Sequence, residues 1–344
     1  MYPLNLNYRM PAEWTKHRRT FISWPVQESM CHPEDYEAVC RSYTEIIQAI
    51  AEFEPITVLL NPGDAERISH LLANERIEFL PVRHNDAWLR DNGPTFLVHD
   101  SGEVAGVNWR FNAWGGKYEP WDLDDQVAGR ILEHVGIRRF DAPLVMEGGS
   151  LHVDGEGTLL TTEECLLNQN RNPELSRKQI ETELKNFLNV RKIIWLKKGL
   201  AGDETDGHVD NIACFAAPGK VLMQVCDDPA DENYEITYLN LALLRKEADA
   251  QGRALEIIPL KQPPKLCDPE TKARLTLSYL NFYFVNGGII LPVFGGEATE
   301  TDRLAVQMFK EIFPERRIRT VNGLGIIREG GNVHCTTQQM PAGI

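Results

Sequence analysis

The chain has 344 residues, of which 42% are hydrophobic and 25% charged, so it is long and apolar enough to form a sizeable core. Its 36 Lys and Arg residues against 50 Asp and Glu residues give a formal net charge of -14. This charge makes nucleic acid and anionic membranes poor partners and suits a cationic ligand better. No apolar run approaches the roughly 18 to 20 residues of a membrane span, and the N-terminus lacks a signal-peptide core. We therefore expect a cytoplasmic protein.

The cysteines predict neither a zinc site nor a disulfide framework. There are seven of them, an odd number, and no two are spaced as Cys-x-x-Cys. Most are expected to be reduced and buried. They are Cys31, Cys40, Cys165, Cys214, Cys226, Cys267 and Cys335.

In chain order, the first predicted elements are a strand at Thr20–Trp24, a helix, and a strand at Ile56–Leu60. The rest of the chain repeats a fuller layout, in which two apolar runs flank a two-residue turn and are followed by a helix and one more strand. The N-terminal elements are then a divergent first copy of the same ββαβ unit. The four turns are Ser101-Gly102, Asp154-Gly155, Pro218-Gly219 and Asn286-Gly287.

Helical periodicity supports two of these units. After the second turn, Asn172 and Pro173 predict a helix start as N-cap and first helical residue, and the next strand is expected at Lys192–Leu196. The fourth turn follows a predicted strand at Leu280–Val285, and the helix after it precedes a strand at Arg317–Val321. The predicted buried faces are Ile180, Leu184, Phe187 and Leu188 in the first helix and Leu304, Met308 and Ile312 in the second.

No linker or low-complexity tract marks a domain boundary, so we expect one domain over residues 1–344. Five units that cannot each bury an apolar face alone suggest a closed ring, in which neighbours complete one core and strands converge on a central site. A conventional α/β sheet with recurring hairpins is the alternative that the periodicity leaves open.

Polar residues concentrate in five short segments where a core strand or a tight turn would prefer apolar ones. Equivalent positions of different units meet near the centre of a ring, which makes these segments one candidate site. They are Asp86–Pro94, Glu147–Ser150, Glu204–Asn211, Asn281 and Gly330–Cys335.

Cys335 is the candidate nucleophile, because a thiol becomes reactive when a neighbour lowers its pKa or takes its proton. His208 can act as that neighbour. In the run His208-x-Asp210 an extended backbone would turn both side chains to the same face. Glu147 could orient the imidazole, as the third group of a hydrolytic triad does. Glycines beside these residues would let the backbone approach a ligand.

Several carboxylates around one thiol suit a guanidinium substrate. They would disfavour the thiolate and repel the oxyanion of an acyl substrate, whereas Asp91 and Asp210 can hold the planar, cationic guanidinium in a fixed orientation. A divalent metal on the His-x-Asp pair with Glu147 and Cys335 is the alternative, but no Glu-x-x-His or His-x-x-x-His spacing supports it. We expect neither a metal nor an organic cofactor.

In their order along the chain, these segments resemble the agmatine deiminase branch of the guanidine-modifying enzymes. The resemblance covers nearly the whole chain and implies the pentein fold, a five-bladed α/β propeller of pseudo-fivefold ββαβ repeats around a central active site. One departure is Glu329, at a position where the family's last motif most often has glycine. The matching segments are Met10–Trp14 with His17 and Trp24-Pro25, Trp88–Pro94, Glu147–Gly149, Glu204–Asn211 and Gly331–Gln339.

The resemblance implies a role for each central residue. Cys335 is the nucleophile, and His208 is the general acid and base. Asp91 and Asp210 clamp the guanidinium, and Glu147 is a partner of both the guanidinium and His208. The implied reaction hydrolyses agmatine to N-carbamoylputrescine and ammonia through a covalent S-alkylthiouronium intermediate. A homodimer serving polyamine metabolism is also implied.

Substrate charge separates the alternatives. Trp88 and Glu204 match family positions that shape the pocket around the distal ammonium, which favours agmatine over free arginine or peptidyl-arginine. A third hypothesis is a protein that binds a guanidinium compound or a polyamine without turnover, but binding alone needs no thiol at Cys335. Three basic residues have no assigned place: Arg83, Arg90 and Arg171.

Overall fold

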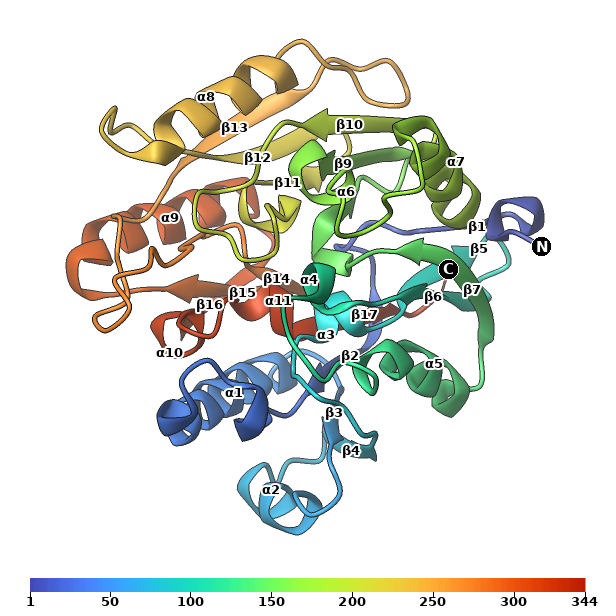
Figure 1. The fold of residues 1–344 in the computed structure, drawn as a ribbon, viewed down its shortest axis with the longest axis vertical. Helices are drawn as coiled ribbons and strands as arrows, with labels where there is room; N and C mark the ends of the chain where they lie inside the picture. Colours follow the sequence, from blue (N-terminus) through green and yellow to red (C-terminus); the bar gives the residue numbers. More distant parts are fainter. Residues whose placement is uncertain (344) are drawn as a thin grey trace.

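The strands of this α/β protein form five separate sheets, each of three or four strands. The computed structural model describes residues 1–343. The long helices are α1 (Tyr36–Ala51), α5 (Asp124–Val135), α7 (Arg177–Leu188), α8 (Glu232–Leu244) and α9 (Thr299–Ile312). The short ones are α2 (Ala65–Leu71), α3 (Leu89–Asn92), α4 (Ala113–Gly116), α6 (Glu163–Leu166), α10 (Leu324–Ile327) and α11 (Val333–Thr336). The long helices lie on the outside, around a centre that holds α3, α4 and α11 (Figure 1).

Three sheets share one pattern. In each, the middle strand pairs antiparallel with the strand before it and parallel with the strand after it, and a long helix connects the parallel pair. The predicted hairpins and the strand at Lys192–Leu196 are confirmed. These sheets are β8 (Leu151–Val153), β9 (Thr158–Thr162) and β10 (Lys192–Leu196); β11 (Ala213–Ala217), β12 (Lys220–Val225) and β13 (Glu256–Lys261); and β14 (Tyr283–Val285), β15 (Gly288–Val293) and β16 (Arg317–Asn322).

A fourth sheet has the same pattern with one strand added at its edge. Here α5 connects the parallel pair, and the short N-terminal strand β1 pairs antiparallel with the first strand. Its strands are β1 (Tyr8–Arg9), β5 (Thr95–His99), β6 (Val104–Arg110) and β7 (Arg138–Val145).

The fifth sheet joins the two ends of the chain. β17 (Thr337–Pro341) pairs antiparallel with β2 (His17–Ser23), which pairs in parallel with β3 (Ile56–Leu60), and β4 (Ile77–Pro81) completes the sheet. The predicted divergent first copy therefore obtains its first strand from the C-terminal end of the chain. Both termini lie on the same side of the molecule (Figure 1). This pairing holds the segment just before β17, which carries Cys335, at the centre.

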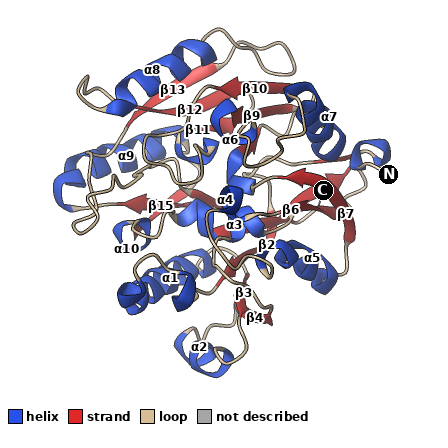
Figure 2. Cartoon of the chain, viewed as in Figure 1, coloured by secondary structure: helices blue, strands red, loops and turns tan. Residues whose placement is uncertain are grey.

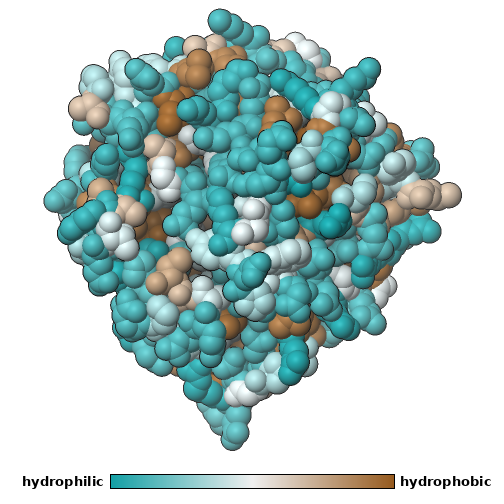
Figure 3. Space-filling view, viewed as in Figure 1, coloured by the Kyte–Doolittle hydropathy of each residue, from teal (hydrophilic) through white to brown (hydrophobic). Residues whose placement is uncertain are grey.

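The long helices lie on the outer side of the sheets (Figure 2). Buried apolar side chains of helices and strands form common clusters. In the fifth sheet, Ile46 and Ile50 of α1 belong to one cluster with Val58 of β3. The face seen in Figure 3 is mostly hydrophilic, with apolar side chains scattered over it. Within residues 1–343, no helix combines the length and the apolar character that crossing a bilayer requires.

The start of α7 was predicted too early. Its N-cap is Ser176, because Ser176 and Gln179 form a capping box, in which each side chain bonds to the backbone of the other residue. Asn172 instead pairs with the backbone of Val145, accepting from its N–H at 3.0 Å and donating to its carbonyl at 2.8 Å. Pro173 lies in the preceding turn. The predicted buried face is confirmed at Ile180, Leu184, Phe187 and Leu188.

The buried face of α9 differs from the predicted one. Leu304 is 43% exposed, whereas Ala305 and Phe309 are buried together with Asp302. The Asp302 carboxylate accepts hydrogen bonds from the backbone N–H groups of Phe294 and Gly295, and this contact turns its side of the helix inward. The predicted stripe is therefore wrong at Leu304, whereas Met308 and Ile312 are partly buried and pack against the same cluster as Ala305 and Phe309.

The strand predicted at Leu280–Val285 is shorter in the structure, where β14 spans Tyr283–Val285. Ser278 Oγ donates to the carbonyl of Asn211 at 2.7 Å, and Asn281 Nδ2 donates to Asn211 Oδ1 at 2.9 Å. These polar contacts hold the residues before β14 in a turn. Asn281 consequently lies at the centre of the molecule instead of within a sheet.

The corrected face of α9 can be tested by stability. Phe309 is fully buried and lies 4.9 Å from Phe282, ring centre to ring centre. Phe309→Ala should lower the free energy of unfolding by about 3 to 5 kcal/mol, because it removes buried contacts and leaves a cavity. Leu304→Ala, the control on the same helix, should change it by less than about 0.5 kcal/mol. Urea unfolding monitored by circular dichroism measures both, and an equal loss for the two variants would contradict the observed face.

Candidate active site

Five segments meet at the centre, and each lies immediately before the first strand of its sheet. They are α3 before β5, the 3-10 turn Gly148–Ser150 before β8, the 3-10 turn Val209–Asn211 before β11, the turn ending at Asn281 before β14, and α11 before β17. Equivalent positions of the five units therefore supply the candidate site.

A cavity with an empty volume of about 690 Å³ opens beside these segments, and we call it the central cavity. Its wall includes four of the predicted site residues: Trp88, Asp91, Glu204 and Cys335. The other three, Glu147, His208 and Asp210, are almost completely buried next to it. The structure thus brings all seven into one region.

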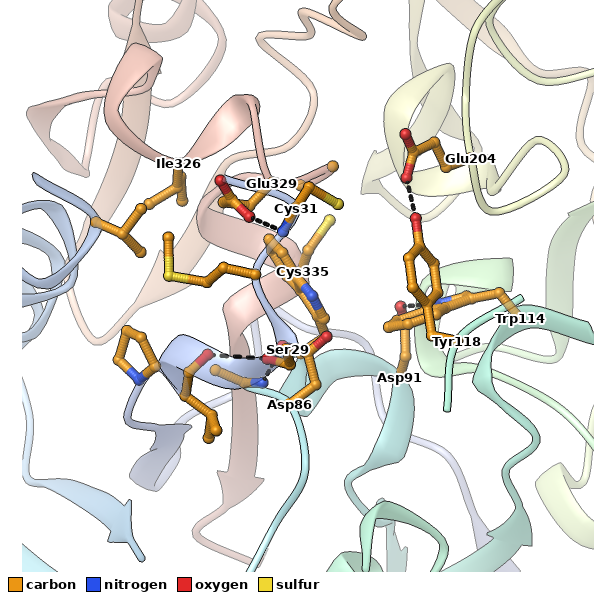
Figure 4. A pocket seen from close by; sticks show the side chains of 18 of the residues that line it. Ser29, Cys31, Asp86, Asp91, Trp114, Tyr118, Glu204, Ile326, Glu329 and Cys335 are labelled. Atoms are coloured by element: carbon orange, nitrogen blue, oxygen red, sulfur yellow. Dashed lines mark hydrogen bonds between the residues drawn. The ribbon is translucent and has the colours of Figure 1, made fainter. Parts of the chain in front are cut away.

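Cys335 lies in α11, whose N-cap Asn332 accepts from the Val333 N–H at 3.0 Å. Its Sγ atom faces the central cavity (Figure 4), 3.1 Å from Asn281 Nδ2 and 3.7 Å from an oxygen of Asp210. Burial raises the pKa of the thiol well above its usual value, and the charges of Asp210 and Asp91 raise it further. The thiol is therefore protonated at neutral pH while the cavity holds no cation.

His208 lies between two carboxylates and caps the 3-10 turn Val209–Asn211. Its Nδ1 is 3.8 Å from Asp91 Oδ1, and its Nε2 is 3.6 Å from Glu147 Oε2. Among residues 1–343, neither ring nitrogen has a hydrogen-bond partner. Burial lowers the pKa of the imidazole, but the charge of Asp91 and the nearby Cys165 and Glu147 side chains outweigh burial and raise that pKa well above its usual value. His208 is therefore an imidazolium with a proton to give.

The extended backbone predicted for His208-x-Asp210 is wrong, because the two residues lie in and before a 3-10 turn. Their side chains nevertheless converge around Gly149. A Cβ atom added there would lie 2.6 Å from His208 Nδ1, 2.9 Å from Asp91 Oδ1 and 3.0 Å from Asp210 Oδ2. Only glycine at position 149 leaves room for these three side chains.

Asp91 and Asp210 face the thiol from two sides. Asp91 accepts from the Gly149 N–H at 2.9 Å and from Trp114 Nε1 at 2.9 Å, which fixes the plane of its carboxylate. Asp210 Oδ2 is held by His334 Nδ1 at 2.9 Å, while its Oδ1 is buried without a partner among the described residues. A free, buried carboxylate oxygen is an acceptor that a ligand with N–H groups can satisfy.

Glu147 is anchored by Arg171, one of the basic residues without a predicted place. Arg171 Nε donates to Glu147 Oε1 at 2.6 Å, and both side chains are fully buried. Burial alone would raise the pKa of Glu147, but Arg171 and His208 outweigh it and lower that pKa. Glu147 is therefore ionised beside the imidazolium of His208.

One group of side chains could hold a metal ion by geometry. The ligand atoms of Glu147, Cys165 and His208 lie within 4.8 Å of one another. However, Arg171 already supplies the positive charge at Glu147, and burial raises the pKa of the Cys165 thiol, so the thiolate that a metal would need is disfavoured. The donor set of Glu147, Cys165 and His208 therefore fits an ion poorly.

Trp88 and Glu204 lie on the wall of the central cavity. Trp88 packs over Gly331, where an added Cβ would lie 2.5 Å from the indole ring. Glu204 accepts a hydrogen bond from the Tyr118 hydroxyl at 2.5 Å (Figure 4). An aromatic face and a carboxylate therefore bound the same space.

Glu329, the departure from the family pattern, also lines the cavity. Its carboxylate accepts from the Cys31 N–H at 2.7 Å and contacts His32 Nδ1 at 3.2 Å. The left-handed residue of this loop is Gly330, with φ 102°. A side chain at position 329 therefore fits without backbone strain, and it ties the loop to the segment around Cys31.

Sequence reasoning missed several residues that contact the site, among them Trp114 and Cys165. Ala113 and Trp114 both adopt positive φ, 51° and 53°, which is unusual for residues with a side chain. The pair of glycines after Trp114 was a signal of an irregular turn there. No local sequence signal pointed to Cys165, because only the tertiary structure brings it close to Glu147.

The chain matches the model of the Porphyromonas-type peptidyl-arginine deiminase family over residues 9–341. It belongs to this family. An agmatine deiminase of Stutzerimonas stutzeri is 45% identical to it, with 99% of this chain and 97% of that protein covered. The solved agmatine deiminase of Enterococcus faecalis superposes with a TM-score of 0.93 at 37% identity, covering 99% of this chain and 97% of that one. A dimethylarginine dimethylaminohydrolase, 13% identical with a TM-score of 0.53 over 94% of this chain and all of its own, shares the fold.

The effect of Asp210 on the thiol gives a prediction with a definite sign. Asp210→Asn removes a negative charge beside Cys335, so the pKa of the thiol should fall and its thiolate fraction at pH 7.5 should rise. Alkylation of Cys335 by iodoacetamide, followed by peptide mass spectrometry, should become several-fold faster. Asp154→Asn, the control, alters a buried carboxylate in the turn between β8 and β9 that accepts from the Glu156 and Thr158 N–H groups, and it should leave the rate unchanged. Slower alkylation in Asp210→Asn would refute the assigned cause.

Proposed function

We propose that this protein is an agmatine deiminase, which hydrolyses agmatine to N-carbamoylputrescine and ammonia through a covalent intermediate on Cys335. The observation that carries the proposal is a buried thiol surrounded by Asp91, Asp210 and the imidazolium of His208. Without a cation these carboxylates disfavour the thiolate. A cationic guanidinium substrate pairs with them, so that they form its binding site.

Substrate binding prepares the nucleophile. The guanidinium N–H groups would donate to Asp91 and to the free oxygen of Asp210, and its charge would offset theirs. The raised pKa of Cys335 then falls, the thiol releases its proton to solvent, and the thiolate lies against the guanidinium carbon. The enzyme thus generates its nucleophile only when the substrate cation is in place.

The chemical steps follow from the charges of the two groups. The thiolate adds to the guanidinium carbon, and His208 gives its proton to the departing nitrogen. Ammonia then departs, and an S-alkylthiouronium remains on Cys335. Neutral His208 then takes a proton from a water molecule, and the hydroxide adds to the same carbon. Expulsion of the thiolate and loss of one proton release N-carbamoylputrescine. Glu147 keeps His208 oriented and favours its protonated form.

The cavity wall favours agmatine over arginine. Its charged side chains are Asp86, Asp91, Glu204 and Glu329, and none of the lining residues within 1–343 is Lys or Arg. The carboxylate of free arginine would find no cation there, whereas the ammonium of agmatine can lie against Trp88 and Glu204. Arginine and peptidyl-arginine are therefore the second candidates.

The architecture fits the same proposal. We infer that the five sheets are the blades of one five-bladed α/β propeller, formed by a single catalytic domain over residues 1–344, with the active site on its axis. The equivalent placement of the five central segments supports this inference. A homodimer and a cytoplasmic location stay predictions.

The nucleophile can be tested by substitution. Cys335→Ser should abolish ammonia release from agmatine while the circular dichroism spectrum stays unchanged. Cys267→Ser, which alters an exposed cysteine, serves as the control and should keep full activity. Mass spectrometry during turnover should detect the thiouronium adduct on Cys335 alone. Loss of activity in Cys165→Ser instead of Cys335→Ser would overturn the assignment, and ammonia release from arginine but not agmatine would overturn the substrate.

Glu204 provides a separate test of the distal ammonium. Glu204→Gln keeps the shape of the side chain but removes its charge, so KM for agmatine should rise by about three- to tenfold with a smaller change in kcat. Glu232→Gln, which alters an exposed carboxylate at the start of α8, is the matched control and should leave KM unchanged. An unchanged KM in Glu204→Gln would place the ammonium elsewhere in the cavity.

A further inference from the structure

Glu13 is a buried carboxylate at the centre that the reaction described above does not use. It belongs to the segment Met10–Trp14, which the sequence singles out without assigning it a role. Its side chain is 4% exposed. It contacts His334, the residue next to Cys335, with 2.9 Å between Glu13 Oε1 and His334 Nε2. A segment near the N-terminus therefore reaches the loop of the nucleophile.

His334 lies between two carboxylates. Its Nε2 contacts Glu13 and its Nδ1 contacts Asp210 Oδ2, both at 2.9 Å. A carboxylate is an acceptor only, so each ring nitrogen must carry a hydrogen to make its contact. Both nitrogens carry a hydrogen only in the imidazolium form. The geometry thus requires His334 to be charged, because a neutral ring has one hydrogen and would leave one of the two buried carboxylates without its contact to His334.

Glu13 is itself held by cations and donors on other elements. Arg90 of α3 contacts Glu13 Oε1 at 3.4 Å, and His152 Nε2 lies 3.5 Å from Glu13 Oε2. His152 Nδ1 accepts from the Phe215 N–H at 3.3 Å, so the ring can donate to Glu13 from Nε2. Burial alone would raise the pKa of Glu13, but His334, Arg90 and His152 together lower that pKa well below its usual value. Glu13 is therefore fixed in position and ionised.

The contact between Glu13 and His334 affects the candidate substrate site through Asp210. Because His334 occupies Asp210 Oδ2, the other oxygen, Oδ1, is the one left free among the described residues. The positive charge of His334 also offsets part of the negative potential that Asp210 places on Cys335, 3.7 Å away.

The two histidines of the site differ in what they can do. Both nitrogens of His334 are occupied by carboxylates, so it cannot accept or give a proton without losing a contact. Both nitrogens of His208 lack hydrogen-bond partners among residues 1–343. His208 can therefore shuttle protons, whereas His334 is a fixed cation.

We propose that Glu13 and His334 are positioning residues for the deiminase reaction: Glu13 keeps His334 as an imidazolium, and His334 orients Asp210 so that its free oxygen receives the guanidinium. This inference rests on the proposed function, since it assigns Asp210 to the substrate. Arg90 supports it from α3 by donating to the backbone carbonyl of His334 at 3.2 Å.

The ionisation of His334 is set by all the groups that face it. Burial and the charge of Arg90 lower its pKa, and Glu13 and Asp210 raise it above its usual value. Loss of the Glu13 charge should therefore lower the pKa of His334 and let it lose its proton as the pH rises. The other titratable groups near Glu13 or Asp210 are Asp91, His152, Asp203, Cys214, Tyr283 and Cys335.

The test is Glu13→Gln in the full-length protein, with kcat/KM for agmatine measured between pH 6 and pH 9. The ratio of wild-type to variant kcat/KM should grow with pH, to about tenfold at pH 9, because deprotonated His334 loses its charge-assisted bond to Asp210. Titration of His208 affects both proteins and cancels in the ratio. A ratio that is constant across this range would overturn the proposal, since a merely structural loss does not depend on the charge of His334.

Two further variants separate charge from packing. Glu54→Gln is the matched control: Glu54 is buried and contacts His17 Nδ1 at 2.9 Å, so it is a second buried Glu–His pair, outside the cavity wall. It should lower the melting temperature without any pH-dependent ratio. His334→Asn keeps a donor close to the position of Nδ1 but removes the charge, so its kcat/KM should fall by a factor that does not change with pH. A pH-dependent ratio in Glu54→Gln would overturn the proposal.

Nitrogen-15 NMR of the histidine rings tests the wild-type protein directly, even if Glu13→Gln does not fold. At pH 8 the His334 ring, assigned by its absence from His334→Asn, should show two protonated nitrogens. A neutral His334 ring at pH 7 in a protein that releases ammonia from agmatine would overturn this inference alone. Absence of ammonia release by the wild-type protein would instead overturn the proposed function, whatever the state of His334.

Discussion

Negative charge buried at the centre is the constraint on which the rest of the site depends. Asp91, Glu147 and Asp210 cannot all be ionised in a dry interior unless cations accompany them. Arg171 and the imidazolium of His208 balance Glu147, and His334 contacts Asp210. One acceptor, Asp210 Oδ1, is left without a partner among residues 1–343. The balance is completed by a cationic ligand, which is why a guanidinium suits this cavity.

The closure of the chain makes that arrangement possible. β17 pairs with β2, so the C-terminal segment that carries Cys335 is locked against the N-terminal sheet. Each sheet then presents the residues before its first strand to the same central space. Five short segments, far apart in sequence, thereby contribute one or two side chains each. The candidate nucleophile Cys335 and its neighbours Asp91, Glu147 and His208 each precede a strand of a different sheet, so rigid sheets and not one flexible loop hold the candidate site.

The repeated pattern of the chain was readable because it depends on local signals. Turns such as Asn286-Gly287 and the β-branched run at Lys192–Leu196 announce strands through preferences that each residue carries alone. The errors arose where tertiary contacts outweighed these preferences. Asp302 accepts a hydrogen bond from the backbone N–H of Gly295, so its side of α9 faces inward. Asn281 donates to the side chain of Asn211 and therefore lies outside the predicted strand.

The sequence by itself determined the strand and turn order, the acidic character of the protein, and the residue types at the site, because composition and local spacing are written in the chain. It also singled out Cys335 as the one thiol set among glycines and polar residues. Only the tertiary structure decided which histidine is free and which is fixed, because His208 and His334 differ in their partners and not in their local sequence. The same holds for Glu13 and Arg171, whose charges act on residues far from them along the chain. Electrostatic balance depends on distance in space, and the fold alone sets that distance.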